Sequence, residues 1–221
     1  SEPGRSESFL GAALKGRRDE VVLSTKFGFA GITMPGSEGW GPKGSARYVR
    51  NAVDASLTRL DTDRIDLLQM HSPDPSTPIE ETLGALSELV AEGKILHFGH
   101  SNYSAEQARH AAHVAAEAGL DGFISSQIEY SLLHRAPEAE LLPTAQDLGL
   151  GVFPYFPLAN GLLTGKYTRD GGGEGRVRSL KPHLLETTNW DLLDAYQRIC
   201  DEAGHSMLTV SIAWLLWHEP I

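Results

Sequence analysis

The stretch "IDLLQMHSPDPSTPIEETLGALSELVAEGKILHFGHSN", residues 65–102, contains two short apolar runs separated by a segment with helical periodicity. The runs "IDLLQMHS" and "KILHFGHSN" are typical of buried strands, and the segment "PIEETLGALSELVAEG" has Pro78 suited to a first helical turn and Gly93 suited to a helix end. Parallel neighbouring strands need a crossover, which a helix supplies. This stretch therefore predicts a strand-helix-strand unit of a parallel sheet.

The same alternation continues on both sides of this unit. Further strands are predicted at residues 21–29, 121–131 and 150–158. Helices are predicted at residues 6–16, 46–60 with Ser45 as a cap, 104–119, 137–149, 189–204 and 206–219. The longest irregular stretches, 29–44 and 168–188, read as functional loops within one domain, because no linker divides the chain. Strands that alternate with helices in this way predict the α/β class.

Two parallel architectures, the doubly wound sheet and the barrel, have to be separated. The Gly-rich run "GGGEG" at 171–175 follows no predicted strand, and there is no phosphate loop that ends in Gly-Lys-Ser/Thr. The notable polar residues lie at strand ends, where barrel active sites are assembled. The pattern therefore favours a barrel.

Composition limits the class of protein. The 221 residues are 41% hydrophobic and 22% charged, as in an ordinary globular protein. The sequence contains 19 Lys and Arg and 29 Asp and Glu. The formal charge of -10 argues against a broad nucleic-acid or membrane surface. A single cysteine, Cys200, excludes an internal disulfide, and no apolar run reaches bilayer length. We expect a cytoplasmic, soluble protein with no membrane or nucleic-acid partner. Assembly into a homo-oligomer is compatible with the sequence.

Two strand-end residues, Lys26 and His71, suggest chemistry. The alternation of a strand groups Lys26 with Val22 and Ser24, and groups His71 with Gln69. On adjacent parallel strands both would reach the same barrel mouth, where a cation and an imidazole can tune a proton donor and polarise a substrate oxygen. Lys26 could instead form a structural ion pair or extend into solvent, and His71 could instead be a packed core residue.

Five motifs in order, "STKFGF", "IDLLQMHSPD", "GKILHFGHSNYS", "SSQIEYSLL" and "YFPLANGLLTGKY", resemble the aldo-keto reductase family from one end of the chain to the other. The resemblance implies a TIM (β/α)8 barrel, incomplete here because its first strands and last strand are missing. Residues 1–221 would then form a single partial barrel domain. It also implies hydride transfer between a nicotinamide cofactor, usually NADP(H) and less often NAD(H), and a small carbonyl substrate, an aldehyde or ketone.

The resemblance also assigns catalytic roles. Lys26 matches the lysine that lowers the pKa of a tyrosine acid, and His71 matches the histidine that orients the carbonyl. The matching aspartate and tyrosine are expected upstream of Ser1. An eighth strand and the loop that recognises the adenosine 2'-phosphate are expected after Ile221.

Cofactor contacts follow from the same resemblance. Ser101, Asn102 and Gln127 match residues that hydrogen-bond the nicotinamide carboxamide, and Tyr155 matches the aromatic that stacks on the nicotinamide ring. For Ser101 and Asn102 the alternative is a helix-start turn, and for Tyr155 it is core packing.

The loop after Tyr155 is expected to surround the pyrophosphate. Backbone groups near Leu158 and Gly161 would approach it, and Lys166 would contact a phosphate unless it is simply a solvated lysine. Phe156 departs from the small polar residue usual at its place, so it is left out of the site. His100 replaces a usual aliphatic residue and is expected to face a helix, and no metal site is expected.

Two other functions stay open. Members of this family also serve as potassium-channel β subunits, so a cofactor-binding regulatory subunit is the first alternative. A catalytically incompetent fragment is the second. The loops do not reveal the substrate.

Overall fold

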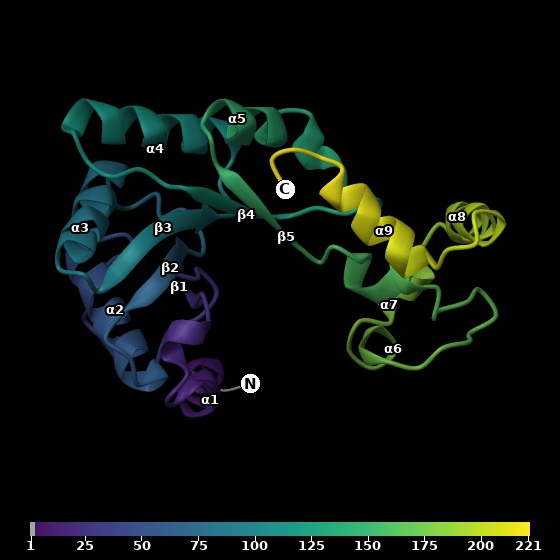
Figure 1. Ribbon diagram of the computed structural model, residues 1–221, viewed down its shortest axis with the longest axis horizontal. Helices are drawn as coiled ribbons and strands as arrows, with labels where there is room; N and C mark the ends of the chain where they lie inside the picture. Colours follow the sequence, from purple (N-terminus) through teal and green to yellow (C-terminus); the bar gives the residue numbers. More distant parts are fainter. Residues whose placement is uncertain (1–2) are drawn as a thin grey trace. The chain divides into compact units, whose positions relative to one another are not determined.

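The computed structural model describes residues 3–221, so the first two residues of the predicted domain 1–221 lie outside the described part. Five strands form one sheet in chain order: β1 (Ser24–Phe27), β2 (Ile65–Met70), β3 (Ile95–Ser101), β4 (Ser125–Glu129) and β5 (Gly151–Tyr155) (Figure 1). The pairings from β1 through β4 are parallel. All five predicted strands and the α/β class are confirmed. The sheet does not close into a barrel within the described residues.

The chain divides into two compact units, and the divisions fall inside β4, inside the helix Leu141–Asp147 and inside β5. The first unit holds the residues up to Gln127 together with Pro143–Val152, and the second holds Ile128–Leu142 with Phe153–Ile221. Each unit is described below by itself. The single partial barrel domain over 1–221 stays a prediction.

The first unit holds helices beside its sheet, and two of them begin at polar side-chain caps. The helices are α1 (Arg5–Leu14), α2 (Ala46–Leu60), α3 (Ile79–Ala91) and α4 (Ala105–Ala118), with a short 3-10 helix at Arg18–Glu20. As predicted, Ser45 caps α2 by accepting a hydrogen bond from the Tyr48 amide at 3.3 Å. Ser104 caps α4 in a reciprocal capping box with Gln107. These two caps fix where α2 and α4 begin.

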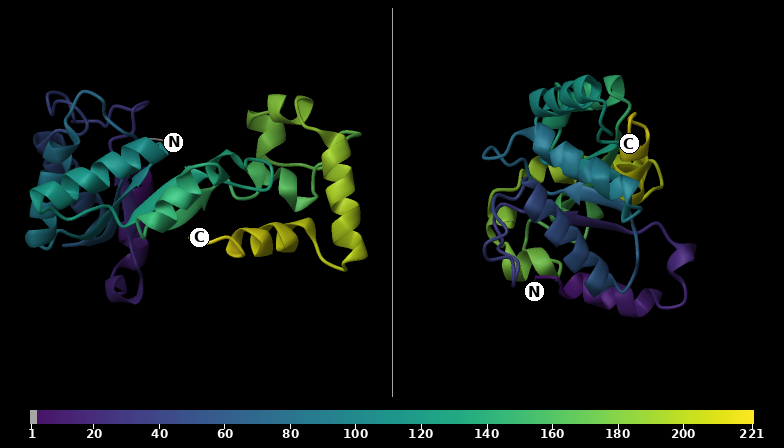
Figure 2. Two further views of the ribbon diagram at one scale, coloured as in Figure 1. Left: turned by 90° about the horizontal axis from the view of Figure 1, so that it is seen from above. Right: turned by 90° about the vertical axis from the view of Figure 1, so that its left-hand side faces the viewer.

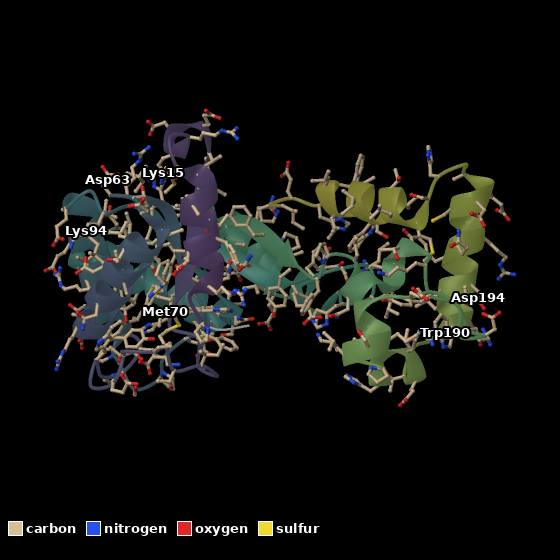
Figure 3. All side chains as sticks on the ribbon, turned by 90° about the horizontal axis from the view of Figure 1, so that it is seen from below. Lys15, Asp63, Met70, Lys94, Trp190 and Asp194 are labelled. Atoms are coloured by element: carbon tan, nitrogen blue, oxygen red, sulfur yellow. The ribbon has the colours of Figure 1, made fainter. Side chains whose placement is uncertain are left out.

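The core of the first unit lies between the sheet and these helices. Leu68 and Phe98, register partners on β2 and β3, are buried against Leu83 and Leu86 of α3. Figure 3 shows the common strand direction: Asp63 and Lys94, which precede β2 and β3, lie toward one end, and Met70, the last residue of β2, lies toward the other. The carboxyl ends of the strands therefore share one edge of the sheet.

The second unit is mostly helical. It holds α6 (Arg176–Leu180), α7 (His183–Glu186), α8 (Trp190–Glu202), α9 (Met207–Leu216) and 3-10 helices at Ala136–Glu138 and Ala159–Thr164. Figure 2 shows α9 turning away from α8 after the break that was predicted at Gly204, which has a positive φ of 72°. Its core contains Leu163, Leu193 and Cys200.

Two predicted elements differ from the structure. The stretch 168–188, expected to be a loop, contains α6 and α7, because the buried Val177 anchors α6 in the core of the second unit. The helix expected at 137–149 begins only at Leu141, as α5 (Leu141–Asp147), which places Pro143 in its first turn, where proline is tolerated. Among the described residues, no helix has both the length and the apolar character needed to cross a bilayer.

Candidate active site

Lys26 and His71 meet at the carboxyl edge of β1 and β2. Lys26 is the register partner of Gln69, two residues before His71, and the His71 amide donates to the Phe27 carbonyl at 2.8 Å. The neighbouring Phe27 and Met70 point into the core beneath the helices, so Lys26 and His71 occupy the opposite side. The predicted grouping of these two side chains is consistent with this arrangement. The Lys26 side of β1 is solvent-exposed within the described residues.

Burial acts on both groups, and the charge of Lys26 acts on His71 as well. Loss of solvation lowers the pKa of Lys26 below its usual value, although part of the side chain still reaches water. Loss of solvation also lowers the pKa of His71, and the positive charge of Lys26 lowers it further. No carboxylate within the described residues pairs with Lys26. His71 is therefore a neutral imidazole at pH 7, beside a cation.

A cavity of about 320 Å³ runs along the edge strand β1 next to this pair. Apolar side chains from the segment 29–44 line one side of it: Phe29, Ile32, Met34 and Trp40. The Phe29 ring lies 4.5 Å, centroid to centroid, from the ring of His71. The space beside Lys26 and His71 is therefore bordered by apolar side chains of the segment 29–44.

Asp74 connects the segment 29–44, called the cavity loop below, to the segment that carries His71. This role was not predicted from the sequence. The Asp74 carboxylate accepts hydrogen bonds from the Gly44 amide at 2.7 Å, from the amide and the hydroxyl of Ser76, and from the Thr77 hydroxyl. Burial alone would raise the pKa of Asp74, but these hydrogen bonds outweigh it and lower the pKa. The only signal in the sequence was an acid ahead of a Ser-Thr turn, which predicts a local turn and not a bond thirty residues away.

Gly44 closes the loop on its other side. Its carbonyl accepts from the buried Thr82 hydroxyl at 2.7 Å, and a Cβ at this position would lie 2.8 Å from the Thr82 hydroxyl oxygen. The side chain of Lys43, the residue before Gly44, donates to the carbonyls of Phe29 and Ile32 near the start of the same loop. Both ends of the cavity loop are thus held by specific hydrogen bonds.

Replacing Asp74 with Ala is expected to lower the free energy of unfolding of the full-length protein by about 2 kcal/mol, because it leaves several partly buried donors without an acceptor. Urea denaturation measures this loss. Asp63→Ala is the matched control, since the Asp63 side chain is 88% exposed and its ion pair with Arg64 is a loose one, at 3.7 Å. Equal effects of the two substitutions would contradict the anchoring role of Asp74.

Ser101, Asn102 and Gln127 come together at the ends of β3 and β4. Ser101 is the register partner of Gln127, and the Asn102 amide donates to the Gln127 carbonyl at 3.2 Å. The Asn102 side chain donates to the His71 carbonyl at 2.9 Å and to the Ser101 hydroxyl at 3.1 Å. Asn102 adopts a left-handed φ of 61°, a conformation that Asn tolerates better than most residues. Their hydroxyl and amide groups supply both donors and acceptors, as recognition of a carboxamide requires.

The other predicted cofactor residues lie in the second unit. Tyr155 ends β5 with its ring centroid 5.4 Å from that of Phe156, and loss of solvation followed by the charge of Glu129 raises its pKa. The Leu158 carbonyl accepts from the amide of Gly161, which has a φ of 101°. The Lys166 ammonium lies 4.9 Å from the centroid of the Tyr167 ring. The roles of these residues toward a cofactor stay predictions.

A second lysine near this turn was missed from the sequence. The Lys181 ammonium donates to the Asn160 side chain at 2.9 Å and lies 4.7 Å from the centroid of the Phe156 ring. These three residues border a cavity of about 330 Å³. No group of three or more metal-binding side chains occurs in residues 3–221.

Comparison with known proteins gives one consistent result. A model described as "Aldo/keto reductase family" matches residues 2–220. The chain is 35% identical over 226 residues to an L-glyceraldehyde 3-phosphate reductase of Escherichia coli (strain K12), covering 97% of this chain and 64% of that protein. It is 36% identical to a probable voltage-gated potassium channel subunit beta of Arabidopsis thaliana, covering 96% of this chain and 66% of that protein, over 226 residues.

A fungal relative shows the same partial coverage. The chain is 37% identical over 226 residues to the aldo-keto reductase str7 of Strobilurus tenacellus, covering 98% of this chain and 63% of that protein. The chain thus spans just under two thirds of the length of these relatives.

Proposed function

Because this chain belongs to the aldo/keto reductase family, we propose that the full-length protein reduces an aldehyde or ketone with NAD(P)H, using Lys26 and His71 as catalytic residues. The bound nicotinamide supplies the hydride that the carbonyl carbon receives. The observation that carries the proposal is the placement of Lys26 and His71 on adjacent strands, joined by the bond from the His71 amide to the Phe27 carbonyl.

The electrostatics support separate roles for the two residues. A neutral His71 donates its ring N–H to the substrate oxygen and orients it, because the lowered pKa keeps a second proton off the ring. Lys26 stays cationic, and its charge favours the anionic form of the tyrosine that the resemblance places upstream of Ser1. That tyrosine would give the carbonyl oxygen its proton while the carbon gains hydride.

The cofactor proposal rests on the cluster at β3 and β4. Ser101, Asn102 and Gln127 would bind the nicotinamide carboxamide, and Tyr155 would stack on its ring. Leu158, Gly161 and Lys166 would surround the phosphates. We take NADP(H) as the cofactor, a closed (β/α)8 barrel as the fold of the full-length protein, and the cytoplasm as its compartment.

The test of this function is direct. Full-length protein is incubated with NADPH and a panel of aldehydes and ketones, and loss of reduced nicotinamide absorbance is followed. The expected result is turnover with at least one small apolar carbonyl, because apolar side chains of the segment 29–44 lie beside His71. Tight NADPH binding without turnover across the panel would refute the catalytic part of the proposal.

Removing one amide tests the cofactor cluster separately. Gln127→Met keeps the length of the side chain and removes its hydrogen bonds, so we expect NADPH to bind about tenfold more weakly, the value of one hydrogen bond. Fluorescence titration measures the dissociation constant. Gln146→Met, at an exposed position of α5, is the control and should bind as the parent does. An unchanged constant for Gln127→Met would remove this residue from the site.

A second candidate function rests on the channel-subunit relatives. Three relatives at 34 to 36% identity are named as probable or putative voltage-gated potassium channel β subunits. In this case the full-length protein would bind NADPH and assemble with a membrane protein as a regulatory subunit. Copurification with a channel protein, together with absent carbonyl turnover, would favour this function over the first.

A further inference from the structure

Glu7 is a buried acid that the proposed function does not use. It lies in the first turn of α1 and is only 8% exposed. One carboxylate oxygen accepts a hydrogen bond from the Thr25 hydroxyl of β1 at 2.6 Å, and the other accepts from Nε of Arg59 on α2 at 2.6 Å. Acids are rarely buried unless they are paired, and this one joins three elements at a single point.

This junction lies next to the candidate active site. Thr25 directly precedes Lys26 in β1, and successive residues of a strand point to opposite faces. Thr25 therefore faces α1, while Lys26 faces the side that carries His71. The bond to Glu7 holds the backbone of β1 one residue away from Lys26.

The chain enters α1 against the same junction. Gly4, which precedes α1, has a φ of 84°, and a Cβ at this position would lie 2.8 Å from Cδ and 3.0 Å from Nε of Arg59. That Nε is the atom that donates to Glu7. Pro3 and Gly4 also border the cavity beside Lys26 and His71. The segment that leads into α1 thus passes directly over the Arg59 side chain.

Two further contacts limit how far α1 can shift on α2. The Arg59 guanidinium donates to the hydroxyl of Ser56, which is buried, at 3.2 Å. At Gly11 of α1, a Cβ would lie 2.6 Å from the carbonyl oxygen of Leu60, so the two backbones are in close contact. A displacement of α1 would therefore break the Glu7 junction and this contact together.

We propose that Glu7 is a positioning residue: by joining α1, α2 and β1, it fixes Lys26 relative to the segment that leads into α1. This role rests on the proposed function, in which the proton-donating tyrosine lies upstream of Ser1. The charge of Lys26 lowers the pKa of that tyrosine only at short distance, because Coulomb attraction falls with separation. Glu7 acts through Thr25 and does not touch the substrate.

Thr25→Val in the full-length protein keeps the shape of the side chain and removes its hydroxyl. We expect kcat to fall about tenfold with an unchanged KM for the carbonyl substrate, less than the roughly hundredfold cost of a misplacement of about 1 Å. The upper pKa in the pH profile of kcat should rise, because a more distant Lys26 lowers the pKa of the tyrosine less. Thr25→Ser keeps the hydroxyl and should restore both values. Thr58→Val is the matched control, since the exposed Thr58 hydroxyl donates to the Asp54 carbonyl within α2.

Glu7→Gln is the second variant. It keeps the size of the side chain and removes the charge that pairs with Arg59, so kcat and its pH profile should change in the same direction. Glu20→Gln is its control, because Glu20 forms an exposed ion pair with Arg17. Circular dichroism confirms that each variant is folded. Lower stability with an unchanged pH profile in both Thr25→Val and Glu7→Gln would overturn the positioning role.

His71 supplies a measurement that does not need turnover. The charge of Lys26 contributes to lowering the pKa of His71, so this pKa should rise in folded Thr25→Val, where the charge is no longer held beside the ring. Titration of the His71 ring signals by NMR measures the change. If the parent reduces no carbonyl, the proposed function fails, and the His71 titration still decides whether the junction positions Lys26. An unchanged His71 titration in Thr25→Val would overturn that role.

Discussion

Replacing Lys26 with Met is expected to lower kcat/KM of the full-length protein by about a thousandfold, a typical effect of removing a group that tunes acid-base catalysis. Met keeps the length of the side chain and removes its charge. Without that charge the proton donor loses acidity in the transition state. The pKa of His71 should rise at the same time, because the positive charge of Lys26 contributes to lowering it.

Steady-state kinetics and the pH dependence of the His71 ring signals measure these two effects. Lys94→Met is the matched control, because Lys94 precedes β3 and pairs with Asp54 at the opposite end of the unit (Figure 3). It should leave both kcat/KM and the His71 titration unchanged. Turnover within tenfold of the parent in a folded Lys26→Met variant would contradict the catalytic role of Lys26.

Lowering the pH from 7 to 4 should reduce the free energy of unfolding of the full-length protein more than that of its His100→Leu variant. The expected difference between the two losses is about 3 kcal/mol. The folded-state pKa of His100 is about 4, against an ordinary value of 6.5. Between these values the unfolded chain binds a proton that the folded chain excludes. The contribution of the neutral ring is therefore fully present above pH 6.5 and is lost as the pH falls toward 4.

Urea denaturation at several pH values measures this difference. His97→Leu is the control, because His97 lies on the same strand but is exposed, so its pH dependence should follow that of the parent. The groups packed on His100 do not titrate in this range: Phe123 has no proton to lose, and burial raises the pKa of Tyr103. Parallel pH profiles for the parent and His100→Leu would show that His100 is not buried as a neutral ring.

Strands and their faces could be predicted from local pattern. Apolar runs with two-residue alternation place Leu68 and Met70 in the core and Gln69 outside the apolar cluster. The same rule correctly predicted that His100 faces a helix. The register that brings Lys26 level with Gln69 follows from parallel neighbours of similar length, so the proximity of Lys26 to His71 could be expected without coordinates.

Features that depend on contacts distant in sequence could not be predicted. Glu7 is buried in the first unit, where it accepts from Thr25 and Arg59 at 2.6 Å, and no local pattern distinguishes it from a solvated acid. The bond from Gly44 to Asp74 is of the same kind. Helix α6 forms in a Gly-rich stretch because Val177 finds a core to pack against, and a tertiary contact of this sort overrides local propensity.

The hydrogen bonds at Lys43 and Gly44 also bear on how this protein could acquire new substrates. They confine the attachment of the cavity loop to a few positions, while Ile32, Met34 and Trp40 lie between those anchors. Loop exchange between relatives, or a combinatorial library, should therefore vary residues 30–42 and keep 43–45 as a fixed junction. A graft designed in this way changes the walls of the cavity without moving the strands that carry Lys26 and His71.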